Sequence, residues 1–169
     1  MSLSCTQILN MKDSFLFLVL LVVLLSCHTT TTTENKNARD EKLPIQGTWK
    51  LLSGTLIEKG DTTVTDYTIE KEFIKIINDT HFAFLSHDLS KGKNADSLFS
   101  AGGGNYSFHD SSYTEHLAYC NDRQWEGNDF HFTVRIHNDT LIQKGIEKID
   151  SLGVDRMNVE KYIRVKGHL

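Results

Sequence analysis

Residues 103–119, GGNYSFHDSSYTEHLAY, contain the pattern that decides the fold. Two runs with alternating apolar and polar side chains meet at Asp110-Ser111, and both residue types are common in tight turns. Pairing the runs across this turn gives three predicted cross-strand pairs, Phe108–Tyr113, Tyr106–Glu115 and Gly104–Leu117. The stretch therefore predicts a β-hairpin. One face would carry Tyr106, Phe108, Tyr113, Glu115, Leu117 and Tyr119, and we expect this aromatic face to point inward.

The same alternation recurs along the chain after residue 46, and no stretch there sustains a helical period over three turns. The runs are rich in Phe, Ile, Val, Thr and Tyr, which suit a pleated, half-buried surface. The eight predicted strands are Gly47–Glu58, Phe73–Ile77, His81–His87, Gly103–His109, Ser112–Tyr119, Phe130–His137, Leu141–Ile146 and Met157–Val165. The chain is therefore expected to be all-β.

The connections between these strands favour a barrel over a sandwich. Three are tight turns, at Asn78-Asp79-Thr80, Asp110-Ser111 and Asn138-Asp139. The others are long, at Lys59–Glu72, Asp88–Gly102, Cys120–Asp129 and Glu147–Arg156. Strict alternation of short and long connections is expected of an eight-stranded antiparallel up-and-down barrel. All tight turns then lie at one end, here named the closed end, and the long connections lie at the opposite, open end.

The predicted inward faces suggest an apolar lumen with a few polar groups, as in small-molecule pockets. Phe82, Phe84 and Phe132 are expected to form its walls, and Tyr106, Tyr113 and Glu115 its polar ligand contacts. An inward carboxylate among tyrosines needs partners or a raised pKa. Glu115 therefore has two interpretations: it orients a ligand, or it bonds to tyrosine hydroxyls and fixes the register of the barrel.

Composition excludes several classes of protein. The 169 residues include 18 Lys+Arg and 22 Asp+Glu, a balance that predicts no nucleic-acid partner. A hydrophobic content of 39% excludes a multi-span membrane protein. Eight histidines lack the spacing of a closed metal site, and no nucleophile elbow or triad is present. We therefore predict no catalytic residue, no metal and no cofactor.

An N-terminal segment has the features of a targeting signal. Residues 15–25, FLFLVLLVVLL, are too short to span a bilayer but suit the apolar region of a secretory signal. Leu24-Leu25-Ser26-Cys27 resembles the bacterial lipoprotein box, in which the cysteine is acylated and becomes the new N-terminus. The resemblance implies a signal peptide at 1–26, lipidation (palmitate) of Cys27 and a membrane anchor. The alternative is a cleaved secretory signal that ends near a cysteine.

The division of the chain follows from this signal. Residues 27–43 hold the lipidated cysteine and a Thr-rich, charged tether, whose composition predicts disorder. Residues 44–169 would form the barrel domain. Loss of Cys5 with the signal and acylation of Cys27 leave Cys120, which we interpret as a small unpaired residue rather than a nucleophile. The domain is expected to be a monomer in the cell envelope, at the outer membrane of a Gram-negative bacterium.

Gly47-Thr48-Trp49 in the first strand and Arg164 in the last resemble the lipocalin signature, in which the arginine stacks over the tryptophan at one end of the barrel. The runs THFAF, SAGGGNY and YTEHLAY are similar to lipocalin-like (calycin-type) domains of unknown function found in Gram-negative lipoproteins. The resemblance implies a barrel that binds a ligand. It also implies that Trp49 and Arg164 meet at the closed end, within cation–π distance of about 6 Å.

Two functions remain open at this point. The first is a non-enzymatic, membrane-anchored binder of a small apolar or amphipathic molecule in the lumen. The alternative is a structural or interaction lipoprotein whose barrel is filled by its own side chains. Its long connections would then bind an envelope partner, and exposed Phe99, Arg123 and Trp125 would favour this alternative.

Overall fold

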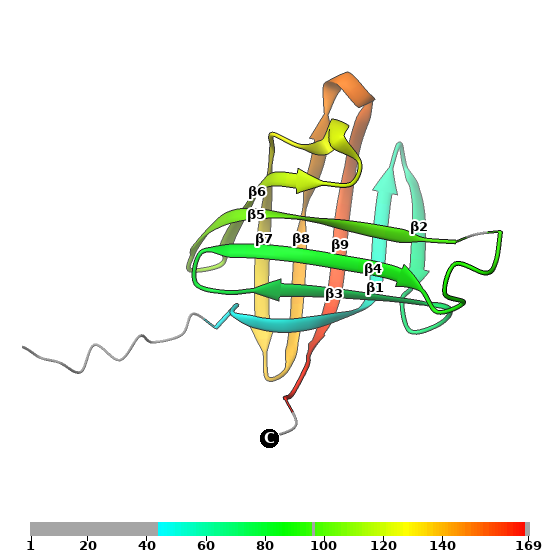
Figure 1. Cartoon of the computed structure of the whole chain (residues 1–169). Coiled ribbons are helices and arrows are strands. Elements are labelled where there is room, and N and C mark those ends of the chain that lie inside the picture. The colour runs from blue at the N-terminus through cyan, green and yellow to red at the C-terminus, as the bar shows by residue number, and fades with distance from the viewer. Residues whose placement is uncertain (1–43, 96, 168–169) are drawn as a thin grey trace, which may run out of the picture. The chain divides into compact units, whose positions relative to one another are not determined.

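The computed structural model describes residues 44–95 and 97–167, which form nine strands and two short 3-10 helices (Figure 1). The strands are β1 (Gly47–Glu58), β2 (Asp61–Asp66), β3 (Lys71–Ile77), β4 (His81–Asp88), β5 (Phe99–His109), β6 (Ser112–Cys120), β7 (Asn128–His137), β8 (Thr140–Ile149) and β9 (Val154–Arg164). The 3-10 helices are η1 (Arg123–Trp125) and η2 (Asp150–Leu152). The predicted all-β class is confirmed.

Eight of the strands form a closed antiparallel up-and-down barrel. Each of β3 to β9 pairs with its neighbour in sequence, and β1 pairs with both β3 and β9, which closes the barrel. Figure 1 shows β3, β4 and β5 crossing in front of β7, β8 and β9. Closure leaves the barrel strands without a free edge over most of their length. The predicted architecture is therefore confirmed, with β2 as one additional strand.

The three tight hairpins lie where the sequence predicts them. Asp110 and Asn138 adopt positive φ angles of 55° and 52° in the β5–β6 and β7–β8 turns. The side chain of Asn78 accepts hydrogen bonds from the backbone N–H groups of Thr80 and His81 in the β3–β4 turn. Asn and Asp suit these positions because they tolerate left-handed backbone and bond to nearby amides. The three turns form the closed end of the barrel.

Three of the predicted long connections are wrong in detail. The segment Asp88–Gly102 is shorter than predicted, because β5 begins at Phe99. The segment Lys59–Glu72 contains β2, which pairs with the outer half of β1 through a two-residue turn at Lys59 and Gly60. The connection Glu147–Arg156 is mostly strand, and only residues 150–153 link β8 to β9. Charged side chains hid the ends of β8 and β9, where Glu147 and Arg156 face each other as a cross-strand ion pair of 2.7 Å.

The predicted hairpin register is confirmed up to a bulge near its open end. Phe108–Tyr113, Tyr106–Glu115 and Gly104–Leu117 are all partners. Gly103 then pairs with Tyr119, so one extra residue lies in β6 and reverses the facing of the residues that follow. Tyr119 is consequently 69% exposed rather than inward. A Cβ on Gly104 would collide with the carbonyl oxygen of His116, so this close approach requires glycine.

The closed end is a filled, hydrogen-bonded unit built on Trp49 and Arg164. The Arg164 guanidinium lies 4.0 Å from the Trp49 ring centroid, which confirms the predicted contact. Arg164 also donates to the carbonyl oxygens of Gln46 and Pro44, each at 2.7 Å. Gly47 has a φ of 141°, and a Cβ there would lie 2.6 Å from Arg164 Nη1. The three residues therefore close the barrel together.

The predicted signal peptide (1–26), the lipidation site Cys27 and the tether (27–43) lie outside the described residues. In the part of the chain that the structure describes, no helix combines the length and apolar character needed to cross a bilayer.

Candidate functional site

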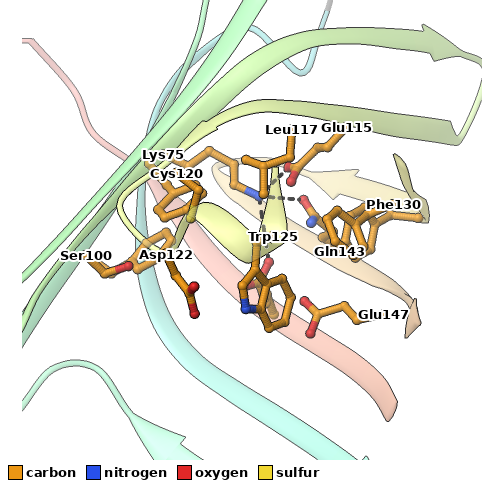
Figure 2. A pocket seen from close by; sticks show the side chains of 14 residues that line it. Lys75, Ser100, Glu115, Leu117, Cys120, Asp122, Trp125, Phe130, Gln143 and Glu147 are labelled. Atoms are coloured by element: carbon orange, nitrogen blue, oxygen red, sulfur yellow. Dashed lines mark hydrogen bonds and ion pairs between the residues drawn. The ribbon is translucent and has the colours of Figure 1, made fainter. Parts of the chain in front are cut away.

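A cavity of about 280 Å³ lies toward the open end of the barrel (Figure 2). Its lining combines aromatic walls with several charged groups, and the residues are Phe73, Lys75, Phe84, Ser100, Glu115, Leu117, Cys120, Asp122, Trp125, Phe130, Phe132, Gln143, Glu147 and Glu160. Most of them come from strands of the barrel, whereas Asp122 and Trp125 come from the β6–β7 connection. The lumen is therefore not completely filled by its own side chains.

A buried lysine is the centre of the polar part of this cavity. Lys75 Nζ lies 2.6 Å from Glu115 Oε1, 3.2 Å from Gln143 Oε1 and 3.8 Å from Glu160 Oε2. The side chains of Lys75 and Glu115 are only 5% and 9% exposed. Figure 2 shows dashed lines converging on the Lys75 ammonium from Glu115 and Gln143. Each of the four residues comes from a different strand, so the cluster links β3, β6, β8 and β9 across the lumen.

The electrostatics of the cluster are set by burial and by mutual attraction. Burial by itself lowers the pKa of Lys75, but the Glu115 and Glu160 carboxylates outweigh it and hold the pKa above its ordinary value. Burial raises the pKa of Glu115, and the Lys75 ammonium offsets this only in part. Lys75 therefore stays charged in the folded state. A buried ion pair of this kind is expensive to break, because removing one partner leaves the other charge desolvated.

Two buried tyrosines extend the polar cluster toward the rest of the lumen. Tyr162 donates a hydrogen bond of 2.7 Å to Glu160 Oε2. Among the described residues, the Tyr113 hydroxyl is buried without a hydrogen-bond partner. Burial raises the pKa of both phenols, and the charge of Glu160 raises that of Tyr162 further. Both hydroxyls consequently remain protonated at ordinary pH.

Trp125 forms a wall of the cavity beside a second charged pair. The Asp122 side chain accepts from the backbone N–H of Gln124 and begins η1, and Asn128 donates to the carbonyl oxygen of Trp125. These bonds hold the indole 5.9 Å from Phe130 by ring centroids. The Arg156 guanidinium lies 5.3 Å from the indole centroid. The wall is thus an aromatic surface held in place by loop hydrogen bonds.

The predicted ligand-contact residues divide into two groups. Glu115, Phe84 and Phe132 line the cavity. Tyr106, Tyr113 and Phe82 do not line it, because they lie nearer the closed end, where their rings fill the lumen. The Tyr106 hydroxyl donates to the carbonyl oxygen of Asn78 in the β3–β4 turn. These three residues therefore fill the lumen beside the cavity and do not line it.

The sequence interpretation of Glu115 is also changed by the structure. Its hydrogen-bond partner at 2.6 Å is Lys75, and the nearby Tyr113 hydroxyl also lowers the pKa of the same carboxyl. Sequence reasoning missed Lys75 and Glu160, although alternation alone places both inward. Lys75 lies between the inward Phe73 and Ile77, and Glu160 lies between the inward Asn158 and Tyr162 on β9. Charged residues are usually expected to face solvent, so inward charged residues such as these are easily overlooked in the sequence.

Within residues 44–95 and 97–167, no group of three or more His, Cys, Asp or Glu side chains is placed to hold a metal ion. His116 instead pairs with Asp129 at 2.8 Å, and His131 bonds to Thr114 at 3.0 Å. Cys120 is a free thiol in the cavity lining. The chemistry that the cavity offers is therefore charge recognition against an aromatic surface.

A scan against family models finds no match for this chain, and a search of curated proteins finds no significant match.

Proposed function

We propose that this protein is a non-enzymatic binder of a small amphipathic molecule, held in the cavity at the open end of the barrel. The observation that carries the proposal is the cavity itself, in which a buried charged cluster faces aromatic walls. Convergent polar groups in an otherwise apolar pocket are typical of small-molecule sites. They orient a ligand, while the aromatic surface supplies the burial that stabilises the complex.

The volume of the cavity restricts the ligand. Small-molecule pockets commonly measure roughly 300–1,000 Å³, and this cavity of about 280 Å³ lies at the lower limit. A compact molecule fits such a space better than a long acyl chain. The side chains of Tyr106, Tyr113 and Phe82 fill the lumen below, which supports a shallow ligand position at the open end.

The proposal includes a membrane anchor through Cys27 and a place in the cell envelope, on the strength of the lipoprotein-box resemblance. Two or more acyl chains would give stable anchoring. Substitution of Cys27 by Ala should move the protein from the membrane fraction to the soluble fraction of its host. An unchanged distribution of the variant would contradict the anchor.

Native mass spectrometry of the chain purified from its own host tests the binder directly. We expect a stoichiometric adduct of small-molecule mass. Cys120→Trp, which introduces a large side chain into the cavity lining, should remove that adduct. Cys120→Ser is the matched control and should retain it. An adduct-free native protein, or an adduct that survives Cys120→Trp in a folded protein, would contradict the proposal.

One observation favours the alternative of a protein partner. Phe99 is 67% exposed at the start of β5, beside the exposed Leu98. Arg123 is also exposed, whereas Trp125 lies in the cavity wall and not on a free surface. If an envelope partner binds these connections, crosslinking from position 99 should capture a single protein, and Phe99→Asp should remove that product. The cavity adduct would be unaffected by Phe99→Asp.

A further inference from the structure

The cavity carries an excess of negative charge. Four carboxylates line it, from Glu115, Asp122, Glu147 and Glu160, and among the described residues the lining contains one cation, Lys75. Arg156, just outside the lining, neutralises Glu147 at 2.7 Å. Lys75 must therefore balance both Glu115 and Glu160, and Asp122 remains unbalanced at the exposed mouth. The lining therefore holds more acidic than basic side chains.

The single lysine is not available to an anionic ligand. Its ammonium is directed at Glu115, Gln143 and Glu160, and its side chain is almost fully buried. A ligand carboxylate would have to displace one of these acceptors and then lie beside carboxylates of like charge. Both steps are unfavourable in a desolvated site. The cavity therefore disfavours anions.

Unused acceptor atoms in the cavity point to a donor on the ligand. Within the described residues, the Glu115 carboxylate accepts its hydrogen bond through Oε1 and has none at Oε2. Glu160 accepts through Oε2, from Tyr162, and its second oxygen is likewise unused. Among the described residues, neither of these two oxygens is a fully buried atom without a partner, so both keep solvent access. Ionised carboxylates accept hydrogen bonds only, so these oxygens can receive an N–H group from a ligand in the cavity.

The walls are suited to the body of such a ligand. Phe73 and Phe84 stack at 5.7 Å by ring centroids, and Trp125 lies 5.9 Å from Phe130. In the view of Figure 2, the carboxylates of Asp122 and Glu147 lie on either side of the Trp125 indole. Aromatic faces bind apolar groups and also attract cations through the ring quadrupole. Acidic groups and aromatic rings therefore line the same space.

We propose that the cavity selects a compact organic amine in its protonated form, with an apolar or aromatic body. The ammonium group is placed by the Glu115 and Glu160 carboxylates, and the body lies against the Trp125–Phe130 and Phe73–Phe84 walls. This inference rests on the proposed luminal binding function and names its ligand class. Lys75 serves to hold the two carboxylates in place, not to contact the ligand.

Three probes of similar shape and different charge test the proposal: 2-phenylethylamine, 2-phenylethanol and 3-phenylpropanoate. Isothermal titration calorimetry with the full-length chain at pH 7 measures the affinity of each. We expect the amine to bind at least about tenfold more tightly than the alcohol, because its hydrogen bonds to carboxylates are charge-assisted. The propanoate should bind more weakly than both.

A variant of the cavity and a matched control sharpen the comparison. Glu160→Gln keeps the shape of the side chain but removes its charge, and should lower the amine affinity about tenfold while leaving the alcohol affinity unchanged. Glu72→Gln removes a carboxylate that pairs with Lys50 and does not line the cavity. This control should bind all three probes as the native chain does. The three-probe comparison on the native chain remains decisive if Glu160→Gln does not fold.

Each outcome separates this inference from the proposed function. Equal affinities for the three probes, or tightest binding of the propanoate, would overturn the amine inference and leave a luminal binder standing. Binding of none of the probes would also overturn it, and native mass spectrometry would then decide separately whether the cavity holds any ligand. Amine selectivity that Glu160→Gln abolishes and Glu72→Gln preserves is the supporting result.

Discussion

The two tryptophans of the chain lie at opposite ends of the barrel, and each has an arginine over its ring. Arg164 lies 4.0 Å from the Trp49 centroid, and Arg156 lies 5.3 Å from that of Trp125. The pairs are chemically alike, but their surroundings differ. Trp49 is fully buried and donates to the carbonyl oxygen of Ile45, whereas Trp125 is half-buried and borders the cavity.

The partners of the two arginines explain this difference. Arg164 donates to two backbone carbonyl oxygens, so its charge ties the chain just before β1 to the end of β9. Arg156 pairs with the carboxylate of Glu147, which lines the cavity. The same cation–aromatic contact therefore ties the chain together at the closed end and lies beside a cavity carboxylate at the open end. The role of each arginine–tryptophan contact follows from its surroundings and not from the residue types.

Trp49→Ala and Trp125→Ala should show the largest difference between the ends. Removing the fully buried Trp49 leaves a cavity under Arg164, and the free energy of unfolding should fall by about 3–5 kcal/mol. Trp125→Ala should cost about 1–2 kcal/mol, because its ring is partly exposed, and should weaken 2-phenylethylamine binding. Urea unfolding and calorimetry measure both effects. Equal stability losses for the two variants would contradict the division of roles.

Lys75→Met tests the buried cluster between the two ends. It leaves Glu115 desolvated without its counter-ion, and we expect a loss of about 3 kcal/mol in unfolding free energy. Adding Glu115→Leu should restore most of this loss, since the unpaired charge is then removed as well. Chemical unfolding of the single and double variants supplies the comparison. A double variant less stable than Lys75→Met would mean that the pair itself, not the orphaned charge, dominates.

High pH should destabilise the barrel through groups that lie between its ends. Lys75, Tyr113 and Tyr162 all have folded-state pKa values raised above the ordinary values of 10.5 for lysine and 10.0 for tyrosine. The proton is therefore held more tightly in the folded state, and the stabilisation is complete below pH 10 and lost as pH rises above it. Each of the three groups should therefore lower the free energy of unfolding as pH rises from 10 to 11.

Absorbance at 295 nm, followed together with urea unfolding from pH 8 to 11, measures this effect. Tyr113 and Tyr162 should ionise only as the protein unfolds, whereas the exposed Tyr119 serves as an internal reference. Ionisation of all five tyrosines of the chain while it remains folded would show that these phenols are accessible.

Arg164→Met and Arg156→Met should show the smallest and most specific difference. Loss of the Arg164 contacts to Trp49 and to two carbonyl oxygens should cost about 1–2 kcal/mol of stability, with amine binding unchanged. Arg156→Met leaves Glu147 unneutralised beside the cavity and should increase the amine affinity. Thermal unfolding and calorimetry of both variants check this. A fall in amine affinity for Arg156→Met would contradict the role given to the cavity charge.

The hairpins and the closed end were predictable because their signals are local or positional. Asn78, Asp110 and Asn138 mark turns through their own backbone preferences, and each lies in the expected hairpin. The register around Asp110-Ser111 followed from counting outward along two alternating runs. Trp49 and Arg164 were placed together by the strand order of an up-and-down barrel.

Other features depend on tertiary context and were missed. The strand Asp61–Asp66 is polar and mostly exposed, so it has no alternation of hydrophobicity to reveal it. The bulge in β6 that turns Tyr119 outward is set by the close approach of Gly104 to the opposite strand. The cavity depends on how far side chains from eight strands extend into the lumen, and no single strand pattern encodes that distance.

The indole N–H signals of Trp49 and Trp125 in a two-dimensional NMR spectrum test the central claim most directly. The chain has two tryptophans, one at each end, so each end has its own reporter. On titration with 2-phenylethylamine, the Trp125 signal should shift progressively while the Trp49 signal stays in place. A shift of the Trp49 signal with Trp125 unchanged would place the ligand at the closed end and contradict the account.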